Sequence, residues 1–122
     1  DPAQWAYWQQ RAGNNIANQL YREGDFLSSL QIYQKLAEMN SSPEWQVPVW
    51  YQIGLVYENL KQVEKAIETY NKIIEREKSS EDLTPSLKQI VEMASWRKQH
   101  LAWALKASLV NDELHSPLEK NL

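Results

Sequence analysis

The sequence predicts an all-α fold, a right-handed α-solenoid in which two helical hairpins precede a long C-terminal capping helix, about five helices in total. The 122 residues include only three Gly and five Pro, and the Pro residues lie where a helix is expected to start or in an irregular C-terminal tail. Apolar residues recur every three or four positions, and the alternation typical of strands is nearly absent. Segments 37 residues apart resemble each other, as expected when similar hairpins stack in a row.

The first hairpin is predicted at about residues 10–43, and its first helix reaches back to the N-terminus. Asp1 suits an N-cap and Pro2 the first helical position. An apolar stripe expected to pack against other helices then runs through Trp5, Trp8, Ala12, Ile16 and Leu20. Asp25 can cap the second helix, whose own apolar stripe consists of Leu30, Tyr33, Leu36 and Ala37. The polar segment at residues 40–43 ends this hairpin.

The second hairpin is predicted at about residues 47–80. Val47 and Pro48 restart the helical pattern, because proline suits a first turn and pushes the preceding residue out of the helical region. Apolar stripes follow on its two helices, formed by Trp50, Ile53, Gly54 and Tyr57 and then by Val63, Ala66, Ile67, Tyr70, Ile73 and Ile74. Trp45 is expected in a loop between Pro43 and Pro48, as a lid over the hairpin ends or as an exposed contact.

The capping helix is predicted at about residues 84–109, after a linker at residues 79–82. Thr84 and Pro85 open it, and apolar residues at helical spacing continue past residue 105. No Gly-Asp break divides it near residues 98–100, which favours one extended helix over a third full hairpin. Residues 1–110 are therefore expected to form a single domain, and residues 111–122 a polar C-terminal tail.

Composition and charge argue against several classes of function. Thirteen Lys and Arg against 16 Asp and Glu leave no basic excess for nucleic acid. The longest uncharged stretches are far shorter than the roughly 20 apolar residues of a membrane-spanning helix. The chain has no Cys, its two His are well separated, and it lacks a G-x-S-x-G turn or a glycine-rich phosphate loop. We therefore expect no catalysis, no metal and no cofactor.

The N-terminus bears on the origin of the chain. Because it starts at Asp1 without an initiator Met, the chain is expected to be a processed product or a domain excised from a longer protein. A chain without Cys is compatible with reducing and oxidising compartments alike. The start and the absence of Cys together suggest the bacterial cell envelope, meaning the periplasm, with the cytoplasm as the alternative.

The second hairpin resembles the tetratricopeptide repeat, whose first helix carries W-x2-L-G-x2-Y and whose second carries A-x3-F/Y. The matching residues here are Trp50, Ile53, Gly54, Tyr57, Ala66, Tyr70 and Lys72. The first hairpin is more degenerate, and the residues that it keeps are Ile16, Ala17, Leu20, Gly24, Asp25, Phe26, Tyr33 and Lys35. It departs from the pattern at Gly13, where an aromatic residue is expected, and at Ser29, where alanine is expected. The resemblance covers about residues 10–78 and implies a non-enzymatic scaffold that binds proteins.

The resemblance also implies a concave groove, lined by the first helices of successive repeats, that holds a peptide or helix of a partner. The lining residues carried over position by position are Arg11, Asn14, Asn18, Tyr21 and Arg22, then Tyr51, Leu55, Glu58 and Asn59. Asn can hydrogen-bond a peptide backbone, Tyr offers contact area, and Arg can bind a carboxylate. A clamp for acidic C-termini is disfavoured, because Asn14 replaces its lysine, although Asn18 matches its asparagine. The alternative interpretation is that these are ordinary solvated polar residues.

A second possible function is self-association, or docking within a larger protein, through the capping helix. The apolar residues Trp96, Ala102, Trp103 and Leu109 cannot all point to one stripe. Some of them must therefore face away from the core, where Trp96, Trp103 and Leu109 would form an interface with a partner or with a second copy in a homodimer.

Overall fold

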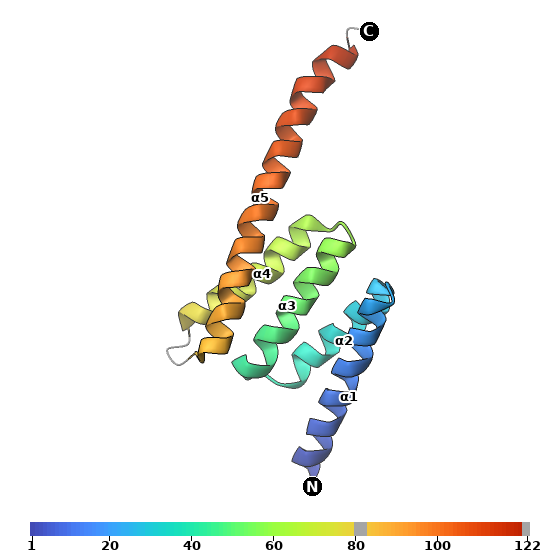
Figure 1. Ribbon diagram of the computed structural model, residues 1–122, viewed down its shortest axis with the longest axis vertical. Helices are drawn as coiled ribbons and strands as arrows, with labels where there is room; N and C mark the ends of the chain where they lie inside the picture. The colour runs from blue at the N-terminus through green and yellow to red at the C-terminus, as the bar shows by residue number, and fades with distance from the viewer. Residues whose placement is uncertain (80–82, 121–122) are drawn as a thin grey trace.

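Five α-helices and their connections make up the structure. The computed structural model describes residues 1–79 and 83–120, with side chains as far as residue 111. The helices are α1 (Pro2–Arg22), α2 (Phe26–Met39), α3 (Pro43–Asn59), α4 (Val63–Ser79) and α5 (Pro85–Lys120) (Figure 1). α1 packs against α2, α3 against α4, and α5 lies along both α3 and α4. The predicted all-α architecture of two hairpins and a long last helix is confirmed; residues 80–82 of the predicted linker lie outside the described part.

The turns within the two hairpins occur at positions 37 residues apart. Gly24 follows the end of α1 with a φ of 86°, and Lys61 follows the end of α3 with a φ of 63°. Both values are left-handed, a conformation that glycine adopts freely and lysine only at a cost. Asp25 then caps α2, because its side chain accepts a hydrogen bond from the Ser28 backbone N–H at 3.3 Å. The same hairpin geometry is thus built twice.

The core consists of two clusters, one on each side of α3. The first joins α1 and α2 to α3, and the second joins α3 and α4 to α5. Tyr33 and Tyr70 are fully buried at positions 37 residues apart, one in each cluster. The Tyr70 ring lies directly against Gly54, where an added Cβ would be only 2.3 Å from Tyr70 Cε1. The large Tyr70 ring therefore fills the space left by the absence of a side chain at Gly54.

The start of α3 differs from the sequence prediction. The helix begins at Pro43, so Pro48 lies inside it and Trp45 belongs to its first turn; the prediction of a loop at Trp45 is wrong. The Trp45 indole N–H donates to the Leu36 carbonyl at 2.6 Å, and the Gln46 amide donates to that of Ala37 at 2.9 Å. These side chains satisfy carbonyls at the C-terminal end of α2, where no further helical turn can do so. That anchorage holds an additional turn of α3 in front of Pro48.

Most of the stripe predicted to pack along α1 lies instead on its exposed side, and only Leu20 of that stripe is half-buried. Trp5, Trp8 and Ile16 are all exposed, and the buried position is Ala17. Gly13 faces Leu36 of α2. Periodicity shows that a helix has an apolar side, but burial needs a neighbour, and within the described chain α1 has its neighbours on the other side.

The last helix is longer than expected. α5 continues to Lys120, whereas the sequence predicted a helix to about residue 109 and a polar tail from residue 111. The buried face of α5 ends near Leu105, before the sequence turns polar at Asn111. Glu, Leu and Lys in the polar part are good helix formers, so the change in polarity does not mark the end of the helix. Figure 1 shows the second half of α5 extending well beyond the other four helices.

Candidate functional site

The nine predicted groove residues all lie on α1 and α3, the first helices of the two hairpins. The 37-residue offset relates Asn18 to Leu55 and Arg22 to Asn59. Applied once more, it reaches Glu92 and Trp96 on α5, which packs on α3 and α4 as the first helix of a third hairpin would. The candidate site is therefore a face shared by α1, α3 and α5.

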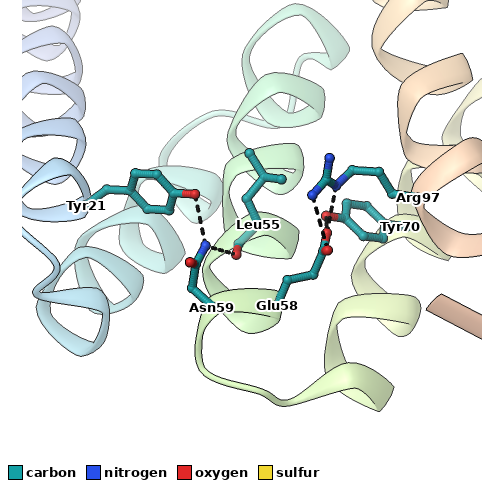
Figure 2. Close-up of polar contacts among 6 residues, drawn as sticks. All are labelled: Tyr21, Leu55, Glu58, Asn59, Tyr70 and Arg97. Carbon is teal, nitrogen blue, oxygen red and sulfur yellow. Dashed lines mark hydrogen bonds and ion pairs between the residues drawn. The ribbon is translucent and has the colours of Figure 1, made fainter. Parts of the chain in front are cut away.

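A hydrogen-bonded bridge joins α1 to α3 (Figure 2). The Asn59 side-chain amide donates to the Tyr21 hydroxyl at 3.0 Å and to the Leu55 carbonyl at 2.9 Å. The Tyr21 ring packs edge to face against Phe26, with the two ring centroids 5.5 Å apart. Three of the predicted residues, Tyr21, Leu55 and Asn59, are thus brought together.

A second bridge joins α3 to α4 and α5 (Figure 2). The Glu58 carboxylate accepts from Arg97 Nε at 2.7 Å and from Arg97 Nη2 at 3.2 Å, and the Tyr70 hydroxyl donates to the same carboxylate. This fork between a guanidinium and a carboxylate fixes both distance and orientation. Hydrogen bonding to Glu58 raises the pKa of Arg97, and burial together with the hydrogen bond to Glu58 raises the pKa of Tyr70.

Arg97 is a site residue that the sequence analysis missed. It lies 39 residues after its partner Glu58, and Asn59 lies 38 residues after its partner Tyr21. Both separations are close to the 37-residue offset that aligns the hairpins, so each bridge joins nearly equivalent positions of neighbouring first helices. Continuing the alignment from α3 onto the capping helix reaches residues 92–96, next to Arg97, and would have indicated the region but not the residue.

Several other predicted groove residues are bound within the domain. Asn18 accepts a hydrogen bond from the buried Tyr33 hydroxyl. Arg22 donates to the Gln19 side chain at 3.3 Å, on the exposed side of α1. Tyr51 is half-buried, and its ring lies 6.0 Å from that of Tyr70. Asn18 and Tyr51 thus help to build the face, whereas the Arg22 guanidinium remains available to a ligand.

Arg11 and Asn14 lie apart from the two bridges, at an open pocket of about 400 Å³. The pocket lies between α1 and the start of α3, and its lining residues are Tyr7, Gln10, Arg11, Asn14, Asn40, Ser42, Glu44 and Trp45. Arg11 Nη1 donates to the Tyr7 hydroxyl at 2.9 Å. The predicted groove therefore divides into this pocket and the bridged face beside it.

Metal-binding clusters and membrane-spanning helices are absent from the described residues. None of their His, Asp and Glu side chains form a group of three that could hold a metal ion. No described helix is long and apolar enough to cross a membrane. His100 stacks on Trp96 with the two rings nearly parallel and 5.3 Å apart.

Comparison with known proteins identifies the second hairpin. The family model of the tetratricopeptide repeat matches residues 47–80, which cover most of α3 and all of α4. No curated protein and no solved structure matches the chain significantly. Repeats of this family generally mediate interactions between proteins and typically serve as non-enzymatic scaffolds. Residues 47–80 therefore match the tetratricopeptide repeat, and they lie within an all-helical fold of stacked hairpins.

Proposed function

We propose that this domain is a non-enzymatic scaffold that holds a peptide or helix of a partner protein across the face shared by α1, α3 and α5. The observation that carries this proposal is the pair of bridges, Tyr21 to Asn59 and Glu58 to Arg97, which tie the three helices together side chain to side chain. A face that is already ordered loses little conformational entropy when a ligand binds. The polar groups of this bridged face and of the pocket beside it are therefore positioned for contact with a ligand.

The chemistry of these groups indicates what they would recognise. Arg11 and Arg22 can each form a two-pronged hydrogen bond with a carboxylate, and Asn14 can bind a peptide backbone through both donor and acceptor atoms. Leu55 offers a half-buried apolar surface between them and α5. This combination suits an extended segment with an acidic residue and an apolar residue.

The test begins with the selection of peptides from a random display library on the folded domain. Affinities of the selected peptides are then measured for the wild type, for Asn14→Ala/Arg22→Ala, and for the control Gln31→Ala/Lys35→Ala. The control removes one amide and one cation from exposed positions of α2. We expect the first variant to bind about tenfold or more weakly, since loss of one charged hydrogen bond costs about 1.5–3 kcal/mol. Equal affinity for both variants would contradict the proposal.

A second candidate function is association through α5. Trp96, Trp103 and Leu109 are all exposed, and much of the helix lies beyond the rest of the domain (Figure 1). Large apolar side chains gathered on one exposed element mark a surface that another protein covers. This candidate uses none of the bridge residues, although the 37-residue offset places Trp96 at the α5 edge of the candidate site.

A further inference from the structure

The exposed side of α5 carries a regular seam. Its residues follow one another at spacings of three, four, three, four and three positions, and they are Met93, Trp96, His100, Trp103, Ala107 and Val110. All six are exposed. Alternating spacings of three and four are the pattern of a helix that pairs along its length with another helix.

The seam lies opposite the face that α5 packs on the domain. Leu87, Val91 and Ala94 form the buried face. At about 100° per residue, Trp96 and Trp103 point roughly 160–180° away from Ala94. A second helix can therefore lie along the seam without meeting the other four helices. Leu109 is about 120° from Trp103 around the helix and does not belong to the seam.

We propose that two copies of the chain pair in antiparallel fashion along this seam. The proposal rests on the second candidate function, association through α5, and names a second copy of the chain as the partner. With the two-fold axis between residues 101 and 102, Trp96 of one copy faces Ala107 of the other. In the same alignment, His100 faces Trp103 and Met93 faces Val110. The large Trp96 then meets the small Ala107, and the flat His100 ring meets Trp103, on which it can stack. A parallel pair would place Trp against Trp and Ala against Ala, which gives bulges beside voids.

The size of the seam is sufficient for a dimer. A Trp side chain can bury about 150–250 Å², so the six exposed seam residues would together bury on the order of 600 Å² per copy. The total of roughly 1,200 Å² reaches the lower limit for a stable interface. Self-complementarity about a two-fold axis is what an isologous dimer needs, and this is the reason for choosing a second copy as the occupant.

The first experiment measures molecular mass against concentration by sedimentation equilibrium. The seam variant is Trp103→Ala/Val110→Ala, and the control is Trp5→Ala/Ile16→Ala on α1. The two pairs are matched, because Trp103 and Val110 are 69% and 55% exposed and Trp5 and Ile16 are 66% and 54% exposed. We expect a wild-type dimer that the seam variant weakens by about thirtyfold or more, as loss of a central Trp typically does, and that the control leaves intact.

Other outcomes would overturn the proposal. A wild-type monomer at all concentrations excludes the pair, as does a dimer that the control variant disrupts and the seam variant does not. A monomer would leave the groove proposal unaffected, because its test uses Asn14 and Arg22, which are far from the seam in sequence and lie on α1.

The second experiment tests the relative orientation of the two paired helices. Because the chain has no Cys, only the introduced cysteines can form disulfides. Chains with Met93→Cys and chains with Val110→Cys are oxidised separately and then as a mixture. An antiparallel pair brings position 93 of one copy next to position 110 of the other, so only the mixture should form disulfide-linked dimers. Efficient crosslinking of each variant alone would mean a parallel pair and would overturn the proposed arrangement.

Discussion

The contact between Gly54 and Tyr70 gives the sharpest test of the packing. In Gly54→Ala the new Cβ would lie 2.3 Å from Tyr70 Cε1, 2.7 Å from Cζ and 3.0 Å from Cδ1. Carbon atoms in contact prefer about 3.5–4.0 Å, so the ring would have to retreat by more than about 1 Å. The ring is fully buried and its hydroxyl is bound to Glu58, so retreat would disturb both the core and the bridge to α5.

Two opposing terms set the size of the effect. Overpacking of a close-packed core typically costs about 1–3 kcal/mol, whereas alanine gains up to about 1 kcal/mol over glycine inside a helix. We expect Gly54→Ala to lower the free energy of unfolding by about 1–2 kcal/mol, since Tyr70 is held at both ends. Ala17 stands at the corresponding place in the first hairpin, in the same cluster as Tyr33. A methyl group is therefore compatible with this hairpin geometry, and the cost at position 54 arises from where Glu58 holds the ring.

The assay is urea unfolding followed by circular dichroism, with Gly13→Ala as the control. Gly13 also lies in a first helix, but its added Cβ would meet only the end of the Leu36 side chain, at 3.0 Å. That end can move by a few tenths of an ångström, and the helical gain offsets the cost, so stability should stay within about 0.5 kcal/mol of wild type. A Gly54→Ala domain as stable as wild type would refute the reasoning.

Two further predictions concern single side chains. Trp45→Phe keeps an aromatic ring but removes the N–H bonded to the Leu36 carbonyl, and urea unfolding should show a loss of about 1 kcal/mol, whereas Trp5→Phe on the exposed side of α1 should show none. Burial raises the pKa of Tyr33 to about 12, above its ordinary value of 10.0. The folded state then binds this proton more tightly, so its contribution to stability should be complete below about pH 10 and decline above it. Urea midpoints across alkaline pH should show a shallower decline in Tyr33→Phe than in wild type.

Much of the fold could be predicted because it depends on local signals. Pro2, Gly24 and Asp25 set the ends of the first two helices through their own backbone chemistry, and the structure places those ends as expected. The start of α3 could not be predicted in this way. It depends on Trp45 and Gln46 reaching carbonyls of α2, a contact between helices that no local pattern records.

The candidate site, too, was predictable only in part from the sequence. The offset of 37 residues put Tyr21 and Asn59 among the predicted groove residues of α1 and α3, but that their side chains meet is seen only in the structure. It could not show that Glu58 would be bound by Arg97, because the capping helix has no Gly-Asp break that would mark it as part of a third repeat. Trp5 and Trp103 show the same limit. Helical spacing predicts an apolar stripe, but it does not predict whether another element covers that stripe. In this fold the tryptophans of α1 and α5 face outward at its two ends, so within one copy no described residue covers them, and a partner has to come from elsewhere.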